Sequence, residues 1–123
     1  MIDVPIRLAA LWVALMLTYL LGDVLRIFAG DYEAGKLGDV EATQAMWMGA
    51  ALIMLIPIAM VIVSVTFDGQ VARWAHIVAA GALLAFNLIG LSTYPGLYDR
   101  FLIGVGLVIN ALTIWVAWGW DAG

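Results

Sequence analysis

The sequence contains no cysteine, and charged side chains make up only 11% of its 123 residues. The absence of cysteine excludes disulfides, thiolate metal ligands and cysteine nucleophiles. Lysine and arginine together number five and the net charge is −4, so there is no basic patch to follow a phosphate backbone and we expect no nucleic-acid partner. Soluble domains carry about 25% charged residues. The deficit therefore points away from water as the main solvent of this chain.

Hydrophobic residues make up 66% of the chain, and its mean hydropathy is +1.08. A soluble fold of this length could not bury so much apolar surface. Four stretches reach the roughly 20 apolar residues that a membrane span needs, and we predict helices over 6–28, 43–67, 71–91 and 97–118. The first is too long for a signal peptide, so we expect it to be retained as a span. The prediction is one all-α domain over 1–123: an integral membrane four-helix bundle in which short connections make sequential helices antiparallel, up-down neighbours.

The numbers of lysine and arginine residues on the two sides of the membrane are nearly equal, two on the side of the termini and three on the other, so they do not decide the orientation. The 29–42 connection carries four acidic residues. This long acidic loop favours termini in the cytoplasm.

Three ionisable or hydroxyl side chains, Tyr19, Asp23 and Arg26, share one face of the first span because spacings of four and three residues bring helical side chains together. An ionisable residue inside a span is a functional hypothesis by default. One interpretation is local pairing, in which Arg26 and Tyr19 satisfy Asp23 and Arg26 extends toward the headgroups. The alternative is a site at the mouth of a central cavity, where Asp23 binds a proton, a cation or an amine.

Polar side chains also interrupt the third and fourth spans. His76 is the single histidine, and without a second ligand it predicts no metal site; it is either an interfacial hydrogen-bonding group or a proton shuttle. Asn87 and Asn110 lie near mid-membrane, where their amides must face protein. With Gly106 and Ala117, Asn110 and Thr113 form a small, polar face that serves either helix packing or a ligand pocket.

The second span contains Pro57, which cannot donate to the Ile53 carbonyl and should kink the helix. Such a kink serves as a hinge in transporters and is also common in ordinary bundles. In the same span, Ala45 and Gly49 form a small-x-x-x-small pair suited to close helix packing.

The stretch TQAMWMGAALIMLIPIAMVIVS (43–64), with RWAHI (73–77), IWVAWGW (114–120) and GDVL (22–25), resembles an uncharacterised family of small four-helix prokaryotic membrane proteins. That family is a domain of unknown function, similar in layout to DoxX-like proteins. The resemblance implies the four-helix fold over nearly the whole chain, a prokaryotic cytoplasmic membrane as its location, and a family position for Asp23. This chain departs from the family pattern at Leu55 and Gly106, where the pattern has acids, and at His76, where it has asparagine. The departures remove the buried carboxylates that would best support ion-coupled transport.

These observations favour a non-catalytic accessory or assembly subunit, or a homo-oligomer, whose partners are membrane lipid and other membrane subunits or further copies of the chain. The alternative is a small transporter or channel for protons, cations or lipophilic amines. A third hypothesis, an intramembrane enzyme, lacks a nucleophile beside a base, because Ser64 and Ser92 lie at span ends without an obvious partner. A quinone or pigment site at His76 also stays open, although we expect no enzyme activity, no cofactor and no metal.

Overall fold

The computed structural model describes residues 2–30, 35–37, 40–91 and 96–121. Its four helices are α1 (Val4–Ala29), α2 (Gln44–Thr66), α3 (Gly69–Gly90) and α4 (Leu97–Trp118). All four are long and apolar enough to span a membrane, as a multi-pass membrane protein requires. The predicted fold class is confirmed, and the helices begin and end within about two residues of the predicted bounds.

A small ladder joins α1 to α2, in a segment that the sequence suggested only as a loop. Strand β1 (Lys36–Leu37) pairs antiparallel with β2 (Val40–Glu41), with Lys36 opposite Glu41. The helix ends on either side are capped. Gly30 ends α1 in the left-handed region (φ 78°), where its N–H reaches the Arg26 and Ile27 carbonyls. The Thr43 hydroxyl accepts the Met46 N–H at the start of α2.

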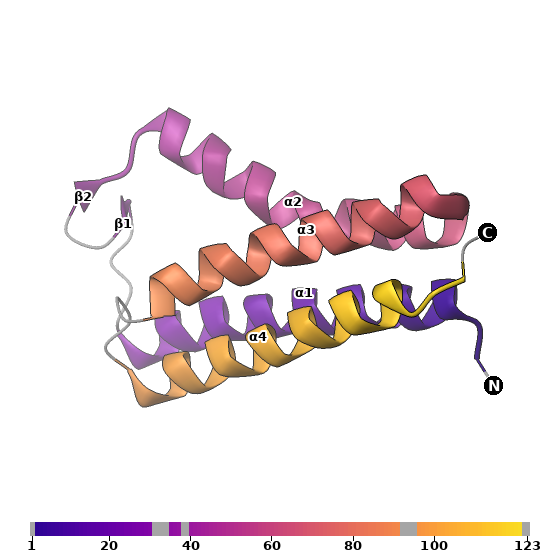
Figure 1. Ribbon diagram of the computed structural model, residues 1–123. Helices are drawn as coiled ribbons and strands as arrows, with labels where there is room; N and C mark the ends of the chain where they lie inside the picture. Colours follow the sequence, from indigo (N-terminus) through magenta and orange to yellow (C-terminus); the bar gives the residue numbers. More distant parts are fainter. Residues whose placement is uncertain (1, 31–34, 38–39, 92–95, 122–123) are drawn as a thin grey trace.

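The helices run alternately in opposite directions, so both ends of the chain lie at one end of the bundle (Figure 1). We call this the terminal end and the other, where α1 ends and α4 begins, the loop end. Helix α1 packs along α2 and α4, and α3 packs along α4, whereas α3 makes only limited contact with α2. About halfway along its length α2 changes direction, and its N-terminal half leaves α3 (Figure 1). Pro57, buried inside α2, supplies no N–H for the helix there.

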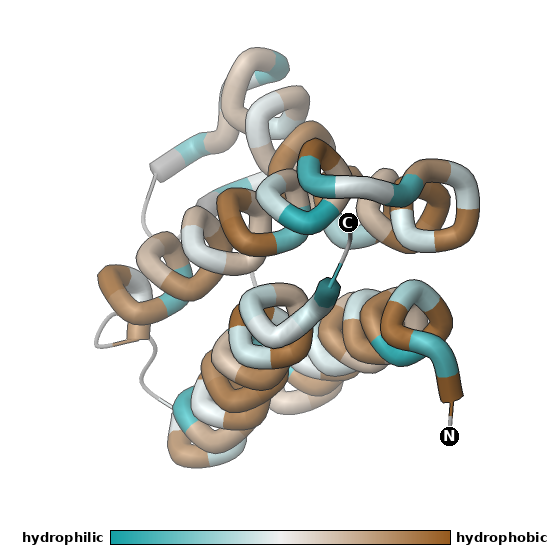
Figure 2. Tube along the Cα trace, turned by 45° about the vertical axis from the view of Figure 1, so that its right-hand side comes forward, coloured by the Kyte–Doolittle hydropathy of each residue, from teal (hydrophilic) through white to brown (hydrophobic). Residues whose placement is uncertain are grey.

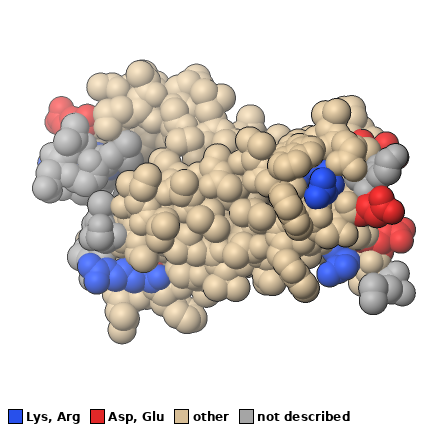
Figure 3. Space-filling view, viewed as in Figure 1, with Lys and Arg blue, Asp and Glu red and all other residues tan. Residues whose placement is uncertain are grey.

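The centre of the bundle is a cluster of buried apolar side chains from α1, α2 and α3. Its buried members are Trp12, Leu15, Met60, Ala80 and Leu83. Many more apolar side chains face outward along every helix, among them Leu17, Leu52, Val78 and Val108, and Figure 2 shows hydrophobic residues along the full length of the helices. On the face drawn in Figure 3, charged side chains gather at the two ends with an uncharged band between them. This distribution matches the polarity of a bilayer.

Candidate functional site

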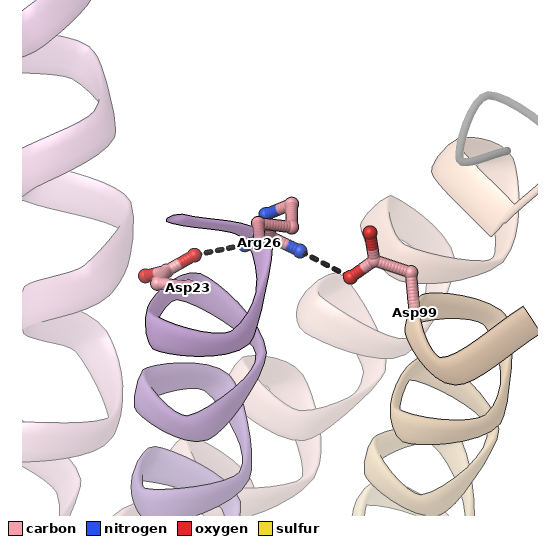
Figure 4. Close-up of polar contacts among 3 residues, drawn as sticks. All are labelled: Asp23, Arg26 and Asp99. Carbon is pink, nitrogen blue, oxygen red and sulfur yellow. Dashed lines mark hydrogen bonds and ion pairs between the residues drawn. The ribbon is translucent and has the colours of Figure 1, made fainter. Parts of the chain in front are cut away.

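An ion-pair cluster joins α1 to α4 at the loop end. Arg26 lies in the last turn of α1, and its Nη1 donates to Oδ1 of Asp99 at 2.7 Å. Its Nη2 donates to Oδ1 of Asp23, one turn earlier on the same helix. Figure 4 shows the guanidinium between the two carboxylates. The Asp99 side chain is 1% exposed, whereas that of Asp23 is 51% exposed. One arginine thus holds a buried and a solvent- or headgroup-facing carboxylate together.

The local sequence explains why these charges meet. Arg26 lies where the carbonyl groups at the end of α1 favour a cation, and Asp99 lies in the first turn of α4, where the free N–H groups favour an anion. Because α1 and α4 are antiparallel neighbours, these two helix ends lie side by side. Asp99 lies within the predicted 97–118 helix, and it is the candidate residue that sequence reasoning missed. The available signal was an acid in the first turn of one span and a base in the last turn of another.

A cavity of about 110 Å³ adjoins this cluster and is lined by all four helices. Its polar lining comes from Thr18, Tyr19, Asp23, Arg26, Asn87 and Asp99. Apolar side chains complete it, with Ile53 and Met54 from α2 and Leu83 and Phe86 from α3. The sequence led to the hypothesis of a cavity with Asp23 at its mouth. The structure contains a cavity that Asp23, itself 51% exposed, helps to line.

Tyr19 and Asn87 form the inner wall of this cavity. The Asn87 amide nitrogen donates to the Tyr19 hydroxyl at 2.6 Å and to the Leu83 carbonyl at 2.8 Å. The Tyr19 ring packs on α4 at Gly106, where a Cβ would approach Cε1 of the ring to 3.4 Å. Of the predicted cluster on α1, the Asp23–Arg26 pair forms, while the Tyr19 hydroxyl is engaged by α3.

His76 lies outside the cavity, nearer the terminal end. Its side chain is fully buried, and the Trp12 indole Nε1 donates to its Nδ1 at 2.9 Å. An Nδ1 that accepts leaves the proton on Nε2, so this hydrogen bond assigns the tautomer. Trp120 packs against the imidazole with ring centroids 6.3 Å apart.

The remaining predicted polar residues lie on the buried face of α4. Thr113 is fully buried and donates to the Ile109 carbonyl at 2.8 Å. Asn110 is also fully buried, close to the Tyr19 hydroxyl but outside hydrogen-bond geometry. Neither lines the cavity at the loop end. The structure therefore separates the candidates into a charged cavity and a line of buried polar groups beyond it.

Within residues 2–30, 35–37, 40–91 and 96–121, no group of three or more His, Asp or Glu side chains could hold a metal ion. At the loop end, two carboxylates and one guanidinium, formally a net charge of −1, lie beside an apolar wall.

A family model described as "Family of unknown function (DUF6326)" matches residues 5–122, and the chain belongs to this family. This confirms the resemblance to an uncharacterised family over nearly the whole chain; the prokaryotic origin and the DoxX-like layout stay predictions. Neither the curated proteins nor the solved structures contain a match to the chain.

Proposed function

We propose that this member of a family of unknown function is a small transporter that binds a lipophilic amine in the cavity at its loop end. The observation that carries the proposal is Asp99, a carboxylate buried in a cavity that all four helices line. In the same proposal the chain ends lie in the cytoplasm of a prokaryotic cell, and transport needs no cofactor.

The charges around the cavity favour a cation. Arg26 occupies one oxygen of Asp99, while Oδ2 of the same carboxylate is buried and has no partner among the described residues. Burial of an unpaired anionic oxygen is costly. An ammonium group would donate to it through a charge-assisted hydrogen bond. An anion would instead meet two carboxylates, Asp23 and Asp99, that already share one arginine.

The rest of the cavity favours an amphiphilic cation. Phe86 lines the cavity and is also 56% exposed, so the opening reaches the outer surface of α3. Ile53 and Met54 line the same cavity from α2, within about one helical turn of Pro57. An apolar cavity of about 150 Å³ holds one benzene molecule, so the smaller space here suits an ammonium head with a few carbons. The ligand's tail would extend through the opening into lipid.

The binding experiment uses the purified full chain in nanodiscs and a fluorescent probe that carries a primary alkylammonium group, whose N–H groups can donate to Oδ2 of Asp99. We expect saturable binding that an unlabelled primary alkylammonium displaces and an alkyl sulfate of equal length does not. Asp99→Asn should weaken binding at least tenfold, which is about 1.4 kcal/mol. The matched control is Asp68→Asn, because Asp68 is an exposed carboxylate at the terminal end that makes no side-chain capping bond.

Two results would contradict the proposal: equal binding of the alkyl sulfate, or unchanged affinity in Asp99→Asn. Uptake of the same cation by proteoliposomes, compared with protein-free liposomes, then tests transport as distinct from binding.

A second candidate is the accessory subunit or homo-oligomer, and one observation on α2 favours it. The predicted packing pair Ala45 and Gly49 lies in the half of α2 that leaves α3. Ala45 is exposed, and a Cβ added to Gly49 would meet no atom within 4 Å. This face is open to a helix of another chain. Native mass spectrometry tests it: a discrete oligomer that Gly49→Leu dissociates supports this role, and a monomer in both forms contradicts it.

A further inference from the structure

Four buried side-chain atoms have no hydrogen-bond partner within the described residues: His76 Nε2, Asp99 Oδ2, and Nδ2 and Oδ1 of Asn110. Each of these residues is at most 1% exposed. Inside a membrane, an unsatisfied polar group costs several kcal/mol because lipid offers no hydrogen bonds. Buried water satisfies such groups where at least two polar partners surround it. Such atoms are the ones that buried water would satisfy.

These atoms follow one another along the bundle. Asn110 comes 11 residues after Asp99 on α4, about 16 Å further along the axis. Tyr19 and Asn87 lie between them, since the Tyr19 ring packs at Gly106, one turn before Asn110. The polar series thus continues inward from the cavity along α4.

The position of His76 is set by the contacts between α3 and α4. Arg73 donates to the Ala117 and Trp118 carbonyls at 2.9 and 2.7 Å. His76 is one turn further along α3, which is antiparallel to α4, so it lies near the level of Thr113. Thr113 is one turn from Asn110, about 5 Å along the axis. The order from the loop end is Asp99, Tyr19 with Asn87, Asn110, and His76.

We infer that this series is a hydrated proton path that connects His76 to Asp99. The path adds a second transported species, the proton, to the cation proposed above, and only its Asp99 end depends on that proposal. Leu15, Met60 and Leu83 pack the centre of the bundle beside it. A packed apolar centre excludes hydrated ions, whereas protons pass along chains of hydrogen-bonded water and side chains.

The groups around His76 define how a proton enters. Trp12 from α1 occupies Nδ1, and Trp120 after α4 packs against the ring. The nearby charge on α3, Arg73, is bound to carbonyls of α4. A proton from water at the terminal end can join Nδ1 only after the Trp12 N–H leaves it. The Nε2 proton then passes to water near Asn110 and on to Oδ2 of Asp99, which releases it to water at the loop end. The proton left on Nδ1 returns to Nε2 by tautomerisation of the imidazole, which restores His76 for the next transfer.

In this order of events Trp12 acts as a gate that slows proton entry at Nδ1 of His76. Trp12→Phe removes the N–H that competes for Nδ1, so proton entry becomes faster. His76→Asn has the opposite effect, because its amide oxygen still accepts from Trp12 but cannot exchange a proton.

The test measures proton uptake by proteoliposomes that contain the full chain and a pH-sensitive dye, driven by a potassium diffusion potential. We expect faster uptake than in protein-free liposomes, still faster uptake with Trp12→Phe, and uptake at the protein-free rate with His76→Asn and with Asn110→Leu. Trp12→Phe combined with His76→Asn should also fall to the protein-free rate, which separates gating from a general leak. Asp68→Asn should match the unmodified chain. Circular dichroism and size exclusion establish that each variant folds.

Wild-type uptake no faster than in protein-free liposomes would overturn the inference, as would full uptake with His76→Asn. If His76→Asn does not fold, full uptake with Asn110→Leu is the overturning result. Alkylammonium binding by the unmodified chain separates the two proposals. Binding without proton uptake overturns the path alone, and uptake without binding overturns the amine site alone.

Discussion

Removing Arg26 should destabilise this bundle far more than removing Asp23, because the two carboxylates that it holds are buried to different extents. Asp99 is 1% exposed and Asp23 is 51% exposed. Arg26→Met leaves the Asp99 carboxylate buried beside an apolar side chain. Loss of one partner from a buried pair costs about 3–5 kcal/mol, and the 22% exposure of Arg26 places this one toward the lower end.

The other variants of the ion-pair cluster should change the free energy of unfolding by smaller amounts. Asp23→Asn alters a partly exposed pair, which is worth about 0–1 kcal/mol. Asp99→Asn keeps an acceptor for Arg26 but loses the charge, so we expect about 1–3 kcal/mol. Replacing both partners, as in Arg26→Met with Asp99→Leu, removes the buried charge altogether. The double variant should therefore be more stable than Arg26→Met alone.

The assay is reversible unfolding in mixed micelles titrated with sodium dodecyl sulfate and followed by far-ultraviolet circular dichroism. Asp68→Asn, an exposed carboxylate at the terminal end, is the control and should change the free energy of unfolding by less than about 0.5 kcal/mol. The reasoning is refuted if Asp23→Asn costs as much as Asp99→Asn, or if the double variant is no more stable than Arg26→Met.

Three further predictions test the contacts between helices. Trp12→Phe should lower the free energy of unfolding by about 1–3 kcal/mol, because it leaves the buried Nδ1 of His76 without a donor. Trp115→Phe, at a side chain that is 69% exposed, is the control and should leave the free energy of unfolding unchanged. Equal losses in the two variants would contradict the hydrogen bond between Trp12 and His76. Gly106→Val should lower the free energy of unfolding by about 1–3 kcal/mol, because the new side chain displaces the Tyr19 ring. Gly104→Val, at a site where a Cβ meets nothing within 4 Å, should lower it clearly less. The reverse order would contradict the packing of the Tyr19 ring against Gly106. Arg73→Met should speed amide hydrogen exchange over 117–121, because it releases the two carbonyls that Arg73 binds at the end of α4. Exchange in α1 should stay constant. Unchanged exchange over 117–121 would show that Arg73 does not hold the end of α4.

The spans were predictable because length and hydropathy alone define them. The first was expected over 6–28 and forms over Val4–Ala29. The contact between Asp23 and Arg26 was also accessible, since residues three apart on a helix are neighbours wherever the helix lies. Both inferences depend only on a single segment of chain.

The contacts between helices were not predictable from this sequence. The Trp12 indole meets His76 across 64 residues, and the Asn87 amide meets Tyr19 across 68. Such pairs depend on which helices are neighbours and how each is rotated, and a shift of one residue turns a side chain by about 100°. The sequence predicted that Asn87 must face protein. It offered no means of choosing Tyr19 as the partner.

The separation of 73 residues between Arg26 and Asp99 bears on how the chain is made. Domains and their parts emerge from the ribosome N-terminal first. When α1 enters the bilayer, its arginine has Asp23 beside it, but the buried carboxylate has not been synthesised. Only the arrival of α4, the last span, completes the pair. A chain that ends after α3 therefore keeps the Asp23–Arg26 pair but lacks the carboxylate that Nη1 of Arg26 binds in the complete bundle.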